Sequence, residues 1–108
     1  MPKLLNNSQI ATIADGETKT SEIDMDQAVD TLLVKLPSLA ACSISLEVSP
    51  GTGGTFTQLG PSSYSANVGT GGFWVELRAH KFRYFKIVSS VAQAGGDDFT
   101  VIGGIDGN

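Results

Sequence analysis

Few residues in this chain have the chemistry of a catalyst. His80 is the single histidine and Cys42 the single cysteine. A general base needs an orienting carboxylate and a site that excludes water, whereas His80, next to Lys81, is predicted to lie at an exposed hairpin tip. Cys42 shares an apolar alternation with Ile44, which favours a buried, unreactive thiol. We therefore expect no enzyme and no catalytic residue.

Carboxylates are the remaining candidates for a metal site. One His and one Cys cannot complete a structural zinc site. Oxygen ligands for calcium are offered by Asp24, Asp26 and Asp30, or by Asp97 and Asp98, but neither group has the spacing of a calcium loop. We interpret them as solvated turn carboxylates, and we expect no metal and no cofactor.

Charge argues against a nucleic-acid partner. Seven basic residues face eleven acidic ones, so the formal net charge is −4, whereas phosphate binding depends on clustered Lys and Arg. The nearest cluster, interleaved with aromatic residues, is Arg78, His80, Lys81, Arg83 and Lys86. Alternation along a strand explains this cluster, because it directs the aromatic side chains into the core and the basic side chains into solvent.

No membrane segment or leader is indicated. No apolar run reaches transmembrane length, and Met1–Gln9 lacks the apolar centre of a signal peptide. We expect synthesis in the cytoplasm and, if the protein leaves the cell, release by lysis or with an assembly.

Period-two alternation is the dominant pattern and indicates strands with one face in a core. It is clearest at Cys42–Val48, followed by the breakers of Ser49–Gly54 and a second strand at Thr55–Leu59. Strand, Pro-Gly turn and strand together predict a hairpin.

Further strands are expected downstream. After a glycine-rich turn at 69–72, Phe73, Val75 and Leu77 are expected in the core, with Trp74, Glu76 and Arg78 facing outward. A polar corner at 79–81 leads to Phe82–Val88, which is apolar on both faces and therefore a central strand. Phe99–Ile102 follows the turn at 95–98.

The first third is less regular. We expect an edge strand at Ile10–Ile13, a bulge in Thr18–Met25, and a strand at Leu32–Leu36 ended by Pro37. A helix over 26–36 is the alternative, although its β-branched residues favour a strand. The whole pattern predicts a single domain, 1–108, folded as an antiparallel β-sandwich or jelly roll of seven or eight short strands, with 1–9 as an extended N-terminal arm.

Trp74 is the side chain that most suggests a function, and three interpretations remain open. It packs in the core if the register is shifted by one residue. It anchors a subunit interface, a role in which Trp is enriched. Alternatively, its face stacks on a sugar.

Two resemblances bear on the choice. The segments Phe73–Leu77 and Phe82–Ser90 are similar to the closing strands of galactose-binding-like β-sandwiches. The alternative function is a carbohydrate-binding module or receptor-binding tail domain, in which Trp74 stacks on a sugar and Asp97 or Asp98 accepts hydrogen bonds from its hydroxyl groups.

The whole chain, poor in Cys and rich in Gly, Ser and Thr, resembles small virion proteins of tailed bacteriophages, in particular jelly-roll decoration or cement proteins. That resemblance implies a non-enzymatic subunit on the capsid surface, with the major capsid protein as partner and a dimer or trimer as assembly. The interface candidates are Trp74, Tyr84, Arg78, Leu4 and Leu5.

Overall fold

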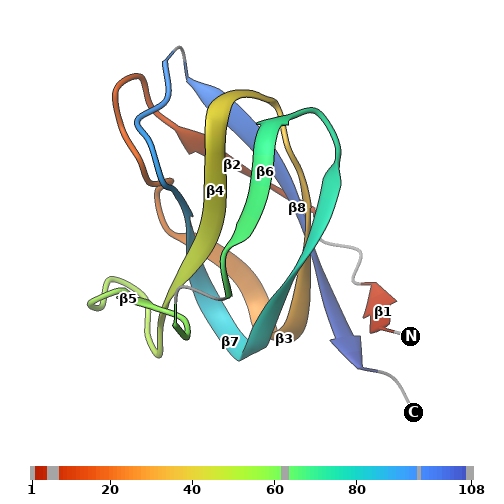
Figure 1. Cartoon of the computed structure of the whole chain (residues 1–108). Helices are drawn as coiled ribbons and strands as arrows, with labels where there is room; N and C mark the ends of the chain where they lie inside the picture. The colour runs from red at the N-terminus through yellow and green to blue at the C-terminus, as the bar shows by residue number, and fades with distance from the viewer. Residues whose placement is uncertain (1, 5–7, 62–63, 95, 107–108) are drawn as a thin grey trace.

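The computed structural model describes residues 2–4, 8–61, 64–94 and 96–106, and within these ranges all regular structure is β (Figure 1). The strands are β1 (Pro2–Leu4), β2 (Gln9–Ile13), β3 (Ile23–Lys35), β4 (Ser38–Ser49), β5 (Thr57–Gln58), β6 (Ala66–Gly71), β7 (Trp74–Ser89) and β8 (Asp97–Asp106). Every pair is antiparallel. The described part of the chain has no helix that could cross a membrane. The all-β expectation is confirmed, and the helical alternative for 26–36 is wrong because these residues extend β3.

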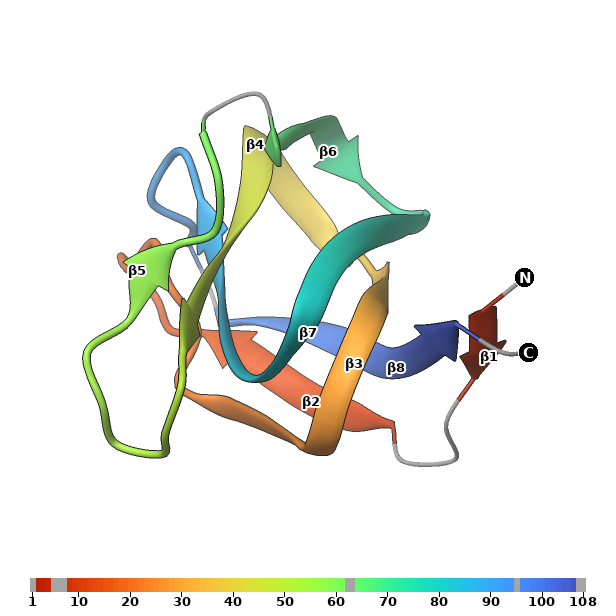
Figure 2. The ribbon, with the colours of Figure 1, turned by 90° about the horizontal axis from the view of Figure 1, so that it is seen from below.

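The strands form one sheet in the order β1-β8-β3-β7-β4-β5, with β2 also on β8 and β6 also on β4. The sheet folds over on itself in a sandwich-like way, so that its parts surround a common interior (Figure 2). We call the part built on β2, β8, residues 31–35 of β3 and residues 74–78 of β7 the first layer. The second layer contains residues 84–89 of β7 with β4, β5 and β6. A jelly-roll connectivity stays a prediction.

Two long strands serve both layers because each bends within its length. β7 bends at His80 and Lys81, whose φ angles are 50° and 66°, and β3 bends at Asp26, whose φ is 68°. The two bends lie side by side, since Val29 pairs with Phe82 and register shifts flank it. Left-handed backbone costs an L-residue about 1–2 kcal/mol, and the Asp26 amide recovers part of this by donating to the Asp24 carboxylate at 2.8 Å.

At the other end of the layers, two arches run together. The chain passes from β3 to β4 at Leu36–Pro37 and from β6 to β7 at Gly72–Phe73, and Leu36 N donates to Phe73 O at 2.9 Å. Gly71 has a φ of 72°, and a Cβ there would collide with the Pro37 carbonyl oxygen. This arch therefore requires glycine.

The core follows the predicted alternation. Cys42, Ile44, Leu46 and Val48 are all buried, and the strand predicted at 82–88 is central, because β4 and the start of β3 pair with its two edges. The largest fully buried apolar side chains are Phe85, Phe99, Ile13, Met25, Leu32, Ile44 and Ile87.

Four expectations are wrong. Phe73 is 49% exposed, because it lies in the arch before β7 begins. The turn expected at 69–72 starts later, since β6 continues to Gly71. His80 is no hairpin tip but an internal residue of β7, and the strands are not all short, as β7 has 16 residues.

The described part of the predicted arm lies on the chain's own sheet. Pro2–Leu4 pairs with β8, Leu4 opposite Gly104, and Gln9 begins β2. Leu5 lies outside the described residues. The role of residues 1–9 as an extended arm stays a prediction.

A buried glutamine fastens the 90–94 loop to the sheet. Gln93 is 2% exposed; its Oε1 accepts from Ala40 N at 2.9 Å, and its Nε2 donates to Ala40 O at 3.2 Å and to Ser89 Oγ at 3.0 Å. Its backbone also bonds to Gly16 and Glu17. The side chain and the backbone of Gln93 together thus connect the 90–94 loop to Ala40 in β4 and to the 16–17 segment.

We expect Gln93→Ala to lower the free energy of unfolding by about 3 kcal/mol, because it leaves buried polar groups unpaired and opens a cavity. Urea denaturation measures this. Gln58→Ala is the matched control: it removes an exposed amide that donates to Gly60 O at 2.9 Å, and it should cost under about 0.5 kcal/mol. An equal loss of unfolding free energy in the two variants would contradict the stabilising role of the Gln93 hydrogen bonds.

Candidate functional site

One row of side chains crosses the outer surface of the first layer. Trp74 pairs with Lys35, Lys35 with Thr100, and Thr100 with Ile10. Residues paired directly across strands share a face, so these four stand next to one another on four strands. Trp74 is 48% exposed and Ile10 65% exposed. The core interpretation of Trp74 is therefore wrong, and its predicted outward register is confirmed.

The neighbouring row on the same face adds apolar area. Leu33 pairs with Glu76 on one side and with Ile102 on the other, and Leu33 and Ile102 are half-buried. We call the surface formed by Ile10, Leu33, Trp74 and Ile102 the outer apolar face. Exposed apolar area of this kind is typical of an interaction site.

The outer surface of the second layer is different, because its charges are matched within the chain. Lys19 and Glu47 form an ion pair at 2.8 Å. Glu22 accepts from Thr52 Oγ1 at 2.6 Å and from Gly53 N at 2.8 Å, and these bonds lower the pKa of its carboxyl. The charges of Lys19, Glu22 and Glu47 are therefore already paired within the chain.

Tyr84 belongs to that second surface. The Arg83 guanidinium lies 5.0 Å from the centre of the Tyr84 ring and binds both carboxylate oxygens of Asp24, at 2.6 and 3.0 Å. Tyr84 is thus half-buried in an ion-paired cluster, across the His80–Lys81 bend from Trp74. The structure does not bring these two predicted interface residues together.

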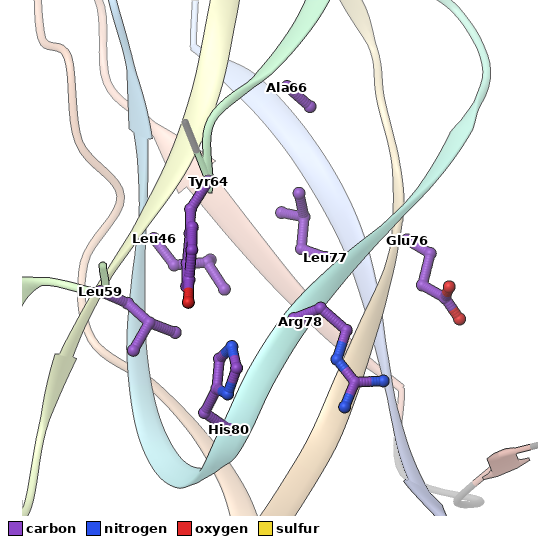
Figure 3. Close-up of a pocket in the computed structure, with 8 residues that line it drawn as sticks. All are labelled: Leu46, Leu59, Tyr64, Ala66, Glu76, Leu77, Arg78 and His80. Atoms are coloured by element: carbon purple, nitrogen blue, oxygen red, sulfur yellow. The ribbon is translucent and has the colours of Figure 1, made fainter. Parts of the chain in front are cut away.

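A pocket of about 450 Å³ lies beside β7 (Figure 3). Its lining residues are Leu46, Leu59, Tyr64, Ala66, Glu76, Leu77, Arg78 and His80. Tyr64 and His80 stack, with ring centres 5.5 Å apart and planes at 19°. Figure 3 shows Leu77 directed toward Tyr64, while the side chains of Glu76 and Arg78 extend from β7 on the side away from it. The cavity is therefore lined mainly by apolar groups.

The loop before β6 positions Tyr64. Tyr64 N donates to Pro61 O at 2.9 Å, which closes a turn. Gly60 has a φ of 74°, and a side chain there would collide with the Tyr64 ring. Sequence reasoning missed Tyr64 because its partner is 16 positions away; the Gly60–Pro61 turn was the one available signal.

The described residues hold no group of three His, Cys, Asp or Glu side chains suited to a metal ion. Two of the carboxylates considered for calcium already have partners: Asp24 binds Arg83, and Asp98 accepts from Thr12 Oγ1 at 2.6 Å.

Comparison with known proteins adds no assignment. No protein-family model matches the chain, and no curated protein sequence matches it.

The Arg83 guanidinium lowers the pKa of the Asp24 carboxyl, and the Asp26 amide adds to this effect. Because the folded pKa lies below the unfolded value, the pair stabilises the fold above the unfolded pKa, and this contribution is lost as the pH falls through the folded pKa. We expect Asp24→Asn to be less stable than wild type at neutral pH, with the gap closing as the solution is acidified below the ordinary aspartate value of 3.8.

Urea titrations at low ionic strength measure this gap, which salt would screen because the pair is partly exposed. In an Arg83→Gln background, Asp24→Asn should show much less pH dependence. An undiminished pH-dependent gap in that background would contradict the role of Arg83.

Proposed function

We propose that this chain is a non-enzymatic virion structural protein, a capsid decoration subunit that binds the outside of a phage shell through its outer apolar face. The observation that supports the proposal is the exposure of Trp74 and Ile10 on one sheet surface, while the two ion pairs found among the described residues, Lys19–Glu47 and Arg83–Asp24, involve the other layer. The resemblance to cement proteins supplies the kind of partner.

The mechanism is addition of buried area across boundaries between shell subunits. A specific interface buries about 1,200–2,000 Å² in total, and a central Trp contributes a large share of the binding free energy. A sheet surface is pre-organised, so little conformational entropy is lost on docking. Bound across a boundary, the subunit would resist local opening under internal DNA pressure, and a dimer or trimer would hold two or more shell sites at once.

The partner in this proposal is the major capsid protein, and the place is the virion surface after synthesis in the host cytoplasm. Co-sedimentation with shells assembled from the major capsid protein of the same genome, together with light scattering on the free protein, tests it. Failure to bind such shells, or a genome without a capsid gene, would contradict the proposal.

We expect Trp74→Ala to weaken shell binding at least about 30-fold, or roughly 2 kcal/mol, by removing the central aromatic anchor. The fold should remain, because Trp74 is outside the core, and urea denaturation checks this. Val91→Ala is the matched control, since Val91 is 40% exposed but lies in the loop before β8. If Trp74→Ala and Val91→Ala bind shells equally tightly, the outer apolar face is not the surface that contacts the shell.

A carbohydrate module is the second candidate, favoured by the exposed Trp74 ring. The expected acceptors do not adjoin it. Thr100 lies two strands from Trp74, and Asp98 lies two residues beyond Thr100, so about 12 Å separates the two positions. The Oδ2 atom of Asp97 is buried. Lys35 and Glu76 are the polar neighbours that a sugar on Trp74 would meet.

Titration of the chain with soluble mono- and oligosaccharides while Trp fluorescence is recorded separates the candidates. We expect no saturable change in Trp fluorescence, because a capsid decoration subunit needs no sugar ligand. A saturable shift that Lys35→Ala removes would favour the carbohydrate module.

A further inference from the structure

The first half of β7 has one open edge. Residues 74–78 pair with β3, and no strand among the described residues pairs with their opposite edge, whereas residues 84–89 pair with β4. In an antiparallel strand, every second residue directs its N–H and C=O to a given side. The stretch from Trp74 to the bend at His80 therefore presents unpaired backbone donors and acceptors in a row.

This edge lacks several of the devices that usually protect one. Protected edges are short, carry proline, or are covered by a loop. The open stretch, residues 74–80 of β7, contains no proline. The stack of Tyr64 on His80 covers only the end nearest the bend.

The apolar pocket lies along the same stretch. Glu76, Leu77 and Arg78 line it from β7, and Leu46 and Ala66 line it from β4 and β6. A strand added to an edge points alternate side chains to the same face. One or two apolar side chains of an added strand would thus enter the pocket while its backbone pairs with β7.

Charge at the edge favours one end of such a segment. Arg78 and Lys81 are exposed and take part in neither of the two ion pairs found among the described residues. They lie close to the bend, in a chain whose net charge is −4. An acidic residue on the incoming segment would find both cations there.

We propose that the open edge of β7 and its pocket form a binding site for an extended peptide segment of a partner protein. The segment adds as a further strand along residues 74–80, places apolar side chains against Leu46 and Leu77, and directs an acidic residue toward Arg78 and Lys81. This mode of recognition takes affinity from backbone hydrogen bonds and specificity from the pocket. The site uses the backbone edge of β7 and the pocket, and it adjoins the outer apolar face at Trp74. It stands whether or not the partner is a capsid shell.

Two blocked heptapeptides of alternating threonine and leucine, with aspartate at one end or the other, are the probes. Nuclear magnetic resonance titration up to about 1 mM peptide covers the weak range of specific binding. We expect saturable shifts and slowed amide exchange within residues 74–80 for at least one peptide. An analogue N-methylated at alternate residues, on the side that faces β7, should bind at least tenfold more weakly, and this comparison needs no variant of the protein.

Variants then test the pocket and the charge. Ala66→Phe, which fills the pocket, should weaken binding at least tenfold; Tyr64→Ala, at an exposed position, should weaken it less. Arg78→Glu should weaken binding at least threefold. Lys35→Glu, an equal charge change on the outer apolar face, should leave it unchanged.

Four results would overturn the proposal. They are absence of binding by both peptides, equal binding of the N-methylated analogue, equal effects of Arg78→Glu and Lys35→Glu, or a peptide-free dimer in which amides 74–80 are already protected. The last result would assign the edge to a second copy of the chain. Loss of shell binding in the earlier experiment would leave this site unaffected, so the two proposals fail separately.

Discussion

The fold depends on β3 and β7 bending at the same level. Three residues with side chains, Asp26, His80 and Lys81, adopt left-handed backbone there, at a cost of about 1–2 kcal/mol each. The cost is tolerated because both halves of each strand are hydrogen-bonded, β3 to β7 and β8 and β7 to β3 and β4. Without the bends, a strand of 16 residues would run out of the small domain. With them, two strands enclose a core that the described residues form without a helix.

The same bend gives β7 its unequal edges. After Lys81, the strand lies between β4 and the start of β3; before His80, it has β3 alone. β6, which could have covered this first half, pairs with β4 instead, because the arch at Gly71–Phe73 carries the chain into the other layer. The pocket beside Leu77 is the space that this separation leaves. The open edge and the apolar pocket thus both follow from the pairing of β6 with β4 rather than with β7.

Sequence alternation predicted what depends on local period and missed what depends on contacts between distant segments. The inward set of Cys42 and Ile44 and the outward direction of Trp74 follow from period two alone. The corner predicted at 79–81 is where β7 bends, although it was expected to separate two strands. The bend at Asp26 was missed because positive φ is expected at glycine. Phe73 was predicted in the core because the arch that exposes it depends on a contact with Leu36, which is distant in sequence. Tyr64 gave no periodic signal, and its stacking on His80 depends on how two distant segments meet.

The two surfaces singled out for binding are joined through the geometry of one strand. Trp74, Glu76 and Arg78 project from the first half of β7 onto the outer face, while the backbone of the same residues borders the open edge. A segment added at that edge would continue the cross-strand row formed by Trp74, Lys35, Thr100 and Ile10, with its own outward side chains beside Trp74. Binding of a partner's extended segment at this edge would therefore widen the outer apolar face. It would also hold the partner near that face and so raise the effective concentration for its contact with the face. A partner that offers both an extended segment and a flat apolar surface would therefore be bound more tightly than one that offers either alone.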